Sequence, residues 1–351
     1  MLEKPDIPDS FIVECLQDEY QLAVAQLEFL PLGADPNTAV YRAIDASRTV
    51  YFVKLRRNSG FDPLTVRIPQ ILSELGVQQI IAPLMTQSNR LEVDMDVEPY
   101  IMTVYPFIKG RDGYEAPLAD HHWIELGQAL KGIHTADLPI NFELSIRREN
   151  FSDKWRESVR KFQRMIDDTS FDDPVAAELV AFLKSKRIEI SILVGRAEHL
   201  ASVVKWHSLP FVLCHADIHA WNVLIDEEDK FYIVDWDTPI LAPKERDLMF
   251  IGAGIGGVWN NAREESLFYE GYGHHPSTIN QDALAYYRFE RIVEDIAVYC
   301  EEILMTTSDV NNADRNAGLQ ALKSQFLPGN VVDIAMKSDS GTNRNRSKST
   351  N

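Results

Sequence analysis

A short polar segment followed by an acidic run constrains this chain more than any other feature of its sequence. Residues 215–222 read HADIHAWN, and residues 235–237 read DWD at the end of an apolar strand. Asp217 precedes Asn222 by five positions and Asp235 by eighteen. Phosphoryl transfer needs a carboxylate that orients the acceptor hydroxyl and takes its proton, and oxygen ligands that hold Mg²⁺ against phosphates. A loop of the form H-x-D-x-x-x-x-N supplies both from one turn, so the segment predicts a phosphoryl-transfer loop.

The pattern of apolar residues predicts an α+β chain with two lobes. The first hundred residues indicate a strand hairpin, a short helix and two further strands, at 40–44 with 50–55, 68–75, 91–93 and 99–104. Beyond Gly110 the period becomes helical, with helices expected at 121–136, 149–167, 174–206 and 282–304 around short strands at 211–214, 223–225 and 231–234. We therefore expect an N-terminal lobe over 1–108, a helical lobe over 109–336 and a disordered tail over 337–351.

The charge of the chain excludes some partners. The 351 residues contain 35 Lys and Arg against 53 Asp and Glu, a net charge of −18. Nucleic acids and anionic membranes are bound mainly through basic side chains, so neither is an expected partner. A cationic ligand would be attracted, although solubility alone could also account for the acidity. Residues 42–67 hold six basic and two acidic residues, so the N-terminal lobe has a basic segment of its own.

Targeting signals and cysteine usage predict a cytoplasmic protein. The chain begins MLEKPD, without the basic start and apolar run of a signal peptide, and no stretch approaches the ~20 apolar residues of a membrane span. Cys15, Cys214 and Cys300 are widely spaced in apolar surroundings, which indicates buried reduced thiols.

From about residue 10 to residue 330, the chain resembles the aminoglycoside phosphotransferase family, whose members are kinase-like small-molecule phosphotransferases. The HADIHAWN and VDWD motifs carry the resemblance most specifically. It implies a bilobal protein-kinase-like fold that binds ATP and Mg²⁺. Asp217 would then be the catalytic residue, Asn222 and Asp235 the Mg²⁺ ligands, and Asp237 a helper. His215 would brace the loop.

The N-terminal lobe matches the family more loosely. Lys54 lies inside an apolar strand, where an unpaired charge is costly, and the resemblance makes it the lysine that contacts the nucleotide phosphates. The loop from Gly33 to Thr38, with Asn37, would cover those phosphates, although it lacks a G-x-G-x-x-G pattern. Glu74 is the one acidic residue in the expected helix that could pair with Lys54. The register would place that partner nearer Ile68, so the pairing stays open.

The segment from Met102 to Gly110 is expected to be a hinge that binds adenine. The edge of adenine needs one backbone acceptor and one donor two residues apart. Pro106 keeps its C=O, and Ile108 has an N–H. We expect these two groups to bind the base, with Tyr105 behind it.

The acceptor follows from the resemblance alone. Antibiotic-modifying members of the family bind cationic aminocyclitols in a carboxylate-lined cleft, and the closest likeness is to members that modify spectinomycin. Carboxylates and aromatic faces can both hold a cation, so the candidates besides Asp217 are Asp237, Trp259, Tyr269 and Glu270. Alternatives are a homoserine, choline or methylthioribose kinase of the same fold, or a pseudokinase that binds nucleotide without transfer.

Two further patterns are expected to be structural. Residues 252–257 read GAGIGG, a match to the dinucleotide fingerprint that lacks the strand and ribose-binding acid such a site needs. His274 and His275 have no other ligand at metal-binding spacing, so a loop is expected there.

Overall fold

The computed structural model describes residues 4–33, 35, 37–95, 99–273, 278–305 and 312–338. The chain forms two compact units. The first contains residues up to Leu118 with 135–146 and 221–239, and the second contains 119–134, 147–220 and the residues from Ile240 onward. Residues 109–118, 135–146 and 221–239, which were expected in the helical lobe, belong to the first unit. His274 and His275, where a loop was expected, lie outside the described residues.

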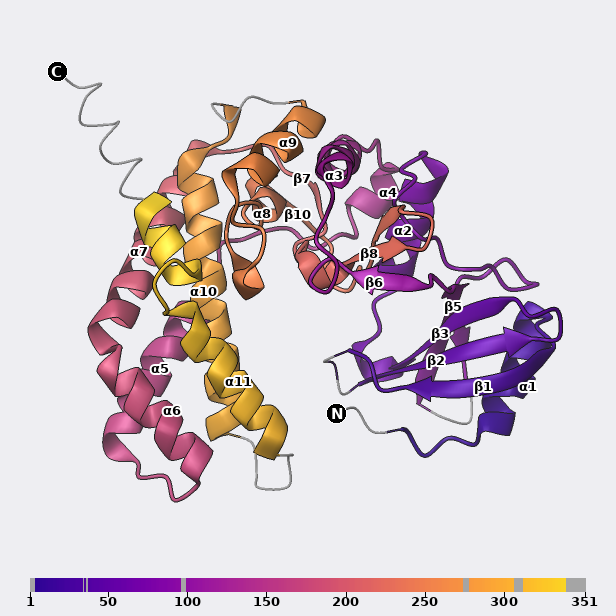
Figure 1. Cartoon of the computed structure of the whole chain (residues 1–351), viewed down its shortest axis with the longest axis horizontal. Coiled ribbons are helices and arrows are strands. Elements are labelled where there is room, and N and C mark those ends of the chain that lie inside the picture. Colours follow the sequence, from indigo (N-terminus) through magenta and orange to yellow (C-terminus); the bar gives the residue numbers. More distant parts are fainter. Residues whose placement is uncertain are drawn as a thin grey trace. The chain divides into compact units, whose positions relative to one another are not determined.

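The first unit is built on an antiparallel five-stranded sheet in the order β1-β2-β3-β5-β4 (Figure 1). Its elements are α1 (Asp9–Tyr20), β1 (Val24–Leu30), β2 (Thr38–Asp45), β3 (Val50–Arg57), α2 (Leu64–Glu74), β4 (Val93–Asp94) and β5 (Tyr100–Pro106). The predicted hairpin of β2 and β3 is confirmed, with Val40 opposite Lys54. The helix α2 begins four residues before the predicted start, and Gly76 follows it with φ +87°.

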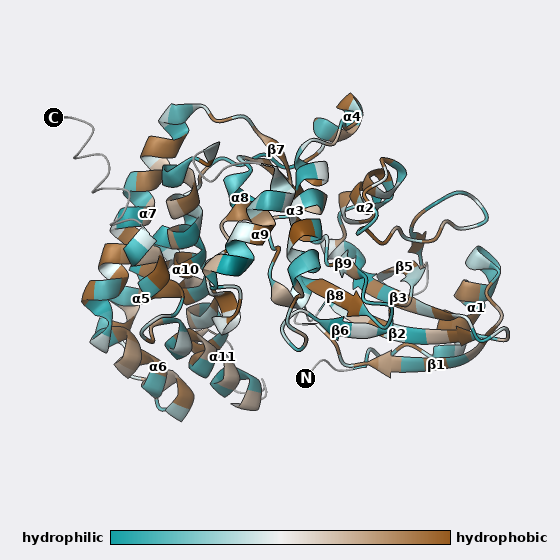
Figure 2. Cartoon of the chain, turned by 45° about the horizontal axis from the view of Figure 1, so that its top comes forward, coloured by the Kyte–Doolittle hydropathy of each residue, from teal (hydrophilic) through white to brown (hydrophobic). Residues whose placement is uncertain are grey.

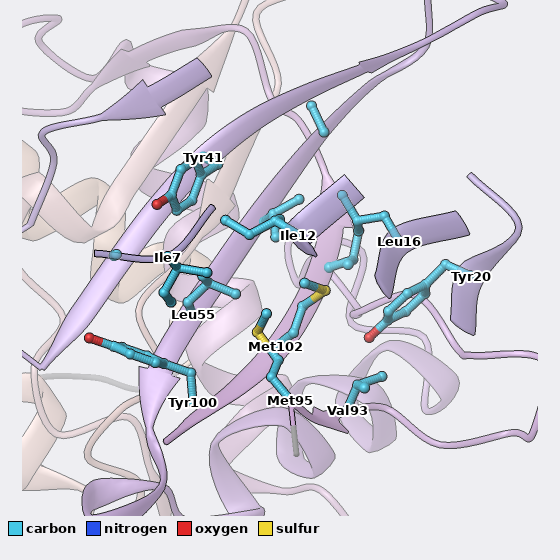
Figure 3. Close-up of a cluster of buried hydrophobic side chains, with 14 residues drawn as sticks. Ile7, Ile12, Leu16, Tyr20, Tyr41, Leu55, Val93, Met95, Tyr100 and Met102 are labelled. Carbon is cyan, nitrogen blue, oxygen red and sulfur yellow. The ribbon is translucent and has the colours of Figure 1, made fainter. Parts of the chain in front are cut away.

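The core of this unit lies between the sheet and α1. Ile12 and Leu16 of α1 are fully buried against Tyr41, Leu55 and Met102 of the sheet (Figure 3). A buried residue of this size contributes about 1.5–3 kcal/mol, so these residues fix the inner face of β3. Because side chains alternate along a strand, the next residues of β3, Lys54 and Arg56, point to the opposite face.

A second, three-stranded sheet in the same unit carries the hairpin that follows the HADIHAWN segment. It contains β6 (Gly110–Asp112), β8 (Val223–Asp226) and β9 (Phe231–Ile233) in that order. Asp226 closes the turn between β8 and β9 by accepting hydrogen bonds from the amides of Glu228 and Lys230. Gly110 pairs with Asp226, and a Cβ at Gly110 would lie 2.1 Å from the carbonyl oxygen of Ile225. The short helix α4 (Ile140–Glu143) also belongs to this unit.

The second unit is mainly helical (Figure 1). Its elements are α3 (Asp120–His134), α5 (Lys154–Asp168), α6 (Pro174–Ser185), α7 (Arg187–His207), β7 (Val212–Cys214), β10 (Ile240–Ala242), α8 (Glu245–Leu248), α9 (Ala262–Tyr272), α10 (Gln281–Leu304) and α11 (Asn312–Gln325). Hydrophobic and hydrophilic residues alternate along these ribbons (Figure 2), as amphipathic packing requires. The stretch predicted as one helix over 174–206 is two, because the chain breaks at Lys186.

Two glycines bring α3 and α9 into close contact. A Cβ at Gly127 would lie 2.1 Å from the carbonyl oxygen of Phe268, and one at Gly271 would lie 1.8 Å from that of Ile124. Only glycine allows the two backbones to approach this closely. The GAGIGG segment is a turn in this unit, with Gly252, Gly254, Gly256 and Gly257 all at positive φ.

The C-terminal segment and the cysteines complete the fold. A helix spans 331–338, and Lys337 pairs with Asp333 at 2.7 Å, so the first two residues of the expected tail are helical. Cys15, Cys214 and Cys300 are not joined in disulfides, and the last two are buried. Among the described residues, no helix combines the length and apolar character needed to cross a bilayer.

Candidate active site

A cavity of about 440 Å³ lies within the first unit. Its walls come from β2, β3, α2, β5, the segment up to Gly110, and the β8–β9 hairpin with the residues after it. The predicted site residues among them are Lys54, Tyr105, Pro106, Ile108, Asn222, Asp235 and Asp237. Residues from four separate parts of the sequence therefore line one cavity, with basic, acidic and apolar groups in its wall.

Two cations from β3 enter this cavity and meet the acidic run. Lys54 Nζ lies 3.1 Å from Asp237 Oδ1 and 3.7 Å from Asp235 Oδ1. Arg56, two residues along the same face of β3, also pairs with Asp237. Burial alone would raise the pKa of Asp237, but Lys54 and Arg56 outweigh it, and the pKa is lowered. The Asp237 carboxylate is therefore ionised at neutral pH.

Asp35 links Arg56 to the start of β2. Its carboxylate accepts hydrogen bonds from the Asn37 amide at 2.9 Å and the Thr38 hydroxyl at 2.8 Å. Arg56 Nη2 lies 3.5 Å from Asp35 Oδ2. The side chain of Asn37 also donates to Asp35, and Gly33 lines the cavity. Ala34 and Pro36 of the predicted phosphate loop lie outside the described residues.

In the predicted hinge, the backbone C=O of Pro106 points away from β3. The amide of Phe107 donates to the carbonyl of Val50 at 3.2 Å, which makes these two residues a hydrogen-bonded pair. In an antiparallel ladder such pairs alternate with non-hydrogen-bonded ones, so the Pro106–Tyr51 pair is of the second kind. The C=O of Pro106 therefore points outward. Phe52 and Tyr105 also line the cavity, with ring centroids 6.5 Å apart.

Asn222 and Asp235 supply oxygen atoms to the same cavity. Asn222 is buried, and its carbonyl accepts a hydrogen bond from the Val234 amide at 3.0 Å, which ties the loop to the hairpin. Asp235 follows directly in the left-handed region, with φ +64°, a conformation that aspartate tolerates better than most residues. One amide and two carboxylate side chains, including Asp237, form the hard oxygen donor set that suits Mg²⁺. The residues present therefore fit the predicted metal.

Asp217 lies in the second unit, on the loop after β7. Arg291 of α10 donates from Nη1 to Asp217 Oδ1 at 2.7 Å, and His219 Nε2 lies 3.3 Å from Oδ2. Burial alone would raise the pKa of Asp217, but the His219 hydrogen bond and the Arg291 charge lower it strongly. The amide of Asp217 donates to His215 Nδ1 at 3.2 Å, so the fully buried imidazole of His215 contacts the loop backbone.

Asp247 anchors the main chain of this loop. Its fully buried carboxylate accepts hydrogen bonds from the amides of His215 at 2.9 Å and Ala216 at 2.6 Å. His134 Nε2 lies 3.0 Å from the same carboxylate, and His134 Nδ1 lies 2.7 Å from the Tyr272 hydroxyl. Since a carboxylate only accepts, Nε2 donates to Asp247. Ala216 has φ +72°, a strained value for a residue with a side chain, and the anchor holds it there.

For the other predicted residues, the structure shows different neighbours or an exposed position. Glu74 is exposed on α2 and accepts a hydrogen bond from Gln70, so the structure does not bring it to Lys54. Trp259 and Tyr269 are buried in the helical unit, where their rings pack against Trp123 and Phe268. Glu270 is exposed on α9. On α10, the Glu294 carboxylate acts electrostatically on both Asp217 and Arg291, and the Asp295 carboxylate acts on Arg291.

The sequence reasoning did not single out Arg56, Asp247 or Arg291, which belong to these networks. Arg56 could have been found, because it follows Lys54 by two positions on the same strand face. Asp247 and Arg291 lie 32 and 74 positions from the loop residues they contact, and neither belongs to a local motif.

Comparison with known proteins identifies relatives of this chain. A model of the phosphotransferase enzyme family matches residues 28–286. A crystal structure of a spectinomycin phosphotransferase with ADP and spectinomycin is 38% identical, with a TM-score of 0.87, over 95% of this chain and 99% of that one. An AMP-bound structure of a spectinomycin phosphotransferase is 37% identical, with a TM-score of 0.81, over 93% and 98% of the two chains.

A more distant match shows the fold alone. An aminoglycoside phosphotransferase from Alicyclobacillus acidocaldarius is 15% identical, with a TM-score of 0.64, over 98% of this chain and 97% of that one. A search of the curated proteins returned no significant match. The predicted kinase-like α+β fold is confirmed by the matched structures. The family model and the two spectinomycin phosphotransferase structures together show that this chain belongs to the phosphotransferase enzyme family and is an enzyme of that class.

Proposed function

We propose that this chain transfers the γ-phosphoryl group of ATP, with Mg²⁺, to a hydroxyl of a small cationic aminocyclitol, and that spectinomycin is the acceptor. Modification of that antibiotic would make the enzyme a resistance factor. The observation that carries the acceptor is the 38% identity to a spectinomycin phosphotransferase over nearly the full length of both chains. The cavity of the first unit and the Asp217 loop of the second support the chemistry.

The nucleotide is proposed to bind in the cavity of the first unit. Its adenine edge would meet the outward C=O of Pro106 and the N–H of Ile108, beside Tyr105. Lys54 would contact the phosphates, because it carries a positive charge into the cavity on a strand fixed by the core. The loop from Gly33 to Thr38, which contains Asn37, would cover the phosphates. The local positive charge is needed, since ATP is an anion and the chain as a whole carries −18.

Asn222 and Asp235 are proposed to hold Mg²⁺ at this cavity, with Asp237 close by. When bound, Mg²⁺ neutralises phosphate charge during transfer. Asp237 pairs with Lys54 and Arg56, so its own part is to orient these two cations.

Asp217 is proposed to orient the acceptor hydroxyl and to take its proton. Its lowered pKa keeps the carboxylate ionised, which is the form that can accept a proton. The acidic residues near it on α10, Glu294 and Asp295, give this region a negative character that suits a cationic acceptor.

An ADP-release assay tests the proposal. The enzyme is offered ATP with spectinomycin, another aminoglycoside, homoserine or choline, each with and without Mg²⁺. We expect ADP release with spectinomycin that requires Mg²⁺. Turnover with homoserine or choline but not with spectinomycin would refute spectinomycin as the acceptor. Equal turnover without any divalent cation would refute the requirement for Mg²⁺.

A further inference from the structure

Arg291 is the residue of α10 that contacts the proposed catalytic carboxylate. Its guanidinium donates from Nη1 to Asp217 Oδ1 at 2.7 Å and from Nε to Asp295 Oδ1 at 2.9 Å. The guanidinium carbon of Arg291 (Cζ) also lies 5.6 Å from the centre of the Phe250 ring. A guanidinium that bonds on two sides and rests on an aromatic ring has one orientation, so the Asp217 carboxylate it holds has one orientation too.

A second bond fixes the outer end of this chain of contacts. Gln325, the last residue of α11, donates from Nε2 to the other carboxylate oxygen of Asp295 at 2.8 Å. The order of contacts is therefore Gln325, Asp295, Arg291 and Asp217. These hydrogen bonds connect α11 to α10 and α10 to the loop that carries Asp217. The position of the Asp217 carboxylate therefore depends on two helices far along the sequence.

We propose that Arg291 is a positioning residue for phosphoryl transfer, which holds the carboxylate of Asp217 in the orientation that the acceptor hydroxyl requires. The inference rests on the proposed role of Asp217. It adds a residue outside the catalytic loop whose loss lowers the rate of transfer and leaves nucleotide binding unchanged, because the nucleotide cavity is formed by the first unit.

The charged groups that face Asp217 come from two elements. His215 and His219 belong to its own loop, and Arg291, Glu294 and Asp295 belong to α10. Arg291 and His219 favour the ionised carboxylate, and Glu294 opposes it. Removal of Arg291 therefore raises the pKa of Asp217. In a plot of kcat against pH, the acidic limb (the pH limb) then moves to higher pH.

The test compares three arginine variants by steady-state kinetics. Arg291→Met removes both hydrogen bonds and the charge, and a misplaced catalytic group of this kind lowers kcat about 100-fold. Arg291→Lys keeps the charge, but one ammonium group cannot reach both Asp217 and Asp295 as the fork does, so it restores part of kcat and the original pH limb. We expect KM for ATP to stay within about twofold in both.

Arg288→Met is the matched control. Arg288 lies one turn earlier on α10, is buried where Arg291 is half-buried, and donates to the main-chain oxygens of Met249 at 3.2 Å and Ile251 at 2.7 Å. Its loss lowers thermal stability, but the kcat per folded molecule and the pH limb stay those of the wild type. If Arg291→Met behaves as Arg288→Met does, Arg291 is only structural and the proposal is overturned.

Asp217→Asn separates the two proposals. If this variant transfers phosphoryl at the wild-type rate, the role of Asp217 fails and that of Arg291 fails with it. If Asp217→Asn is inactive while Arg291→Met keeps full kcat and an unshifted pH limb, only the role of Arg291 fails.

Discussion

Replacement of Asp247 by Asn tests how the fold holds the catalytic loop. Three donors converge on this carboxylate: the amides of His215 and Ala216 and the imidazole of His134. Asn has nearly the same shape but offers only one acceptor oxygen. If the amide nitrogen takes the place of Oδ1, it faces the Ala216 N–H at 2.6 Å, and if it takes the place of Oδ2, it faces the His215 N–H at 2.9 Å. Either orientation leaves one buried loop amide without an acceptor.

The cost can be worked from these contacts. A buried donor without a partner costs about 1–3 kcal/mol, and each remaining bond loses about 1 kcal/mol when its acceptor is no longer charged. The sum for Asp247→Asn is about 3–5 kcal/mol. Unfolding entropy of about 2.1 cal/mol/K per residue then predicts a fall in Tm of about 4–7 °C for a transition of the whole chain. We also expect kcat to fall, because the strained Ala216 can relax and move Asp217.

Differential scanning calorimetry and the ADP-release assay measure the two effects. Asp167→Asn is the control, since Asp167 pairs with Arg187 at the exposed surface of the same unit and its replacement leaves Tm unchanged. A variant at Asp247 with the Tm and the turnover of the wild type would show that the anchor is not needed and would refute the reasoning.

The anchor also predicts a dependence of stability on pH. Burial alone would raise the pKa of Asp247, but the bonds from His134 and the loop amides outweigh it, so the folded pKa lies below its usual value near ~3.9. A lowered pKa contributes stability above the unfolded pKa, and this contribution is lost as pH falls through the folded value. The difference in Tm between the wild type and Asp247→Asn should therefore narrow below about pH 4.

The sequence could predict the local parts of this account. The spacing of Asp217, Asn222 and Asp235 is a local property of one loop and one hairpin, and Lys54 is conspicuous because a charge inside an apolar strand needs a partner. Glu74 is only a candidate partner from the sequence, because it is the one acidic residue of the expected helix and the register leaves the pairing open. The structure pairs Lys54 with Asp235 and Asp237 instead. These acids lie about 180 positions away, after β9 of the three-stranded sheet, so only the tertiary packing of the first unit brings them to Lys54.

The parts that could not be predicted depend on long-range packing. Trp259 and Tyr269 were plausible ligands for a cation because aromatic residues serve both binding and core packing, and only their neighbours show that the rings are packed. The break between α6 and α7 at Lys186 has no glycine or proline to mark it, so an apolar pattern alone reads through it. Arg291 contributes through α10, and nothing in its local sequence indicates Asp217 as a partner.

Two further predictions concern packing and nucleotide use. Gly127→Ala places a methyl group 2.1 Å from the Phe268 carbonyl oxygen and forces α3 away from α9, which lowers the free energy of unfolding by about 1–3 kcal/mol. Gly195→Ala on α7 meets no atom within 4 Å, and its higher helix propensity raises the free energy of unfolding by about 1 kcal/mol. Thermal melts should therefore move in opposite directions, and a shared direction would contradict the packing argument. Lys54→Ala should lower kcat/KM for ATP about 10–100-fold, or about 1.4–2.7 kcal/mol, while KM for the acceptor changes little. Initial rates at varied ATP measure this effect, and an unchanged dependence on ATP would remove Lys54 from the nucleotide site.

The most direct test of the account follows the phosphoryl group itself. ATP labelled at the γ-phosphate is incubated with spectinomycin, Mg²⁺ and either the wild type or Asp217→Asn, and label in spectinomycin is measured beside ADP. We predict one labelled spectinomycin per ADP with the wild type, and at least about 100-fold less with Asp217→Asn at unchanged ADP affinity. Label that never reaches spectinomycin with the wild type, or that reaches it equally fast with Asp217→Asn, would contradict the central claim.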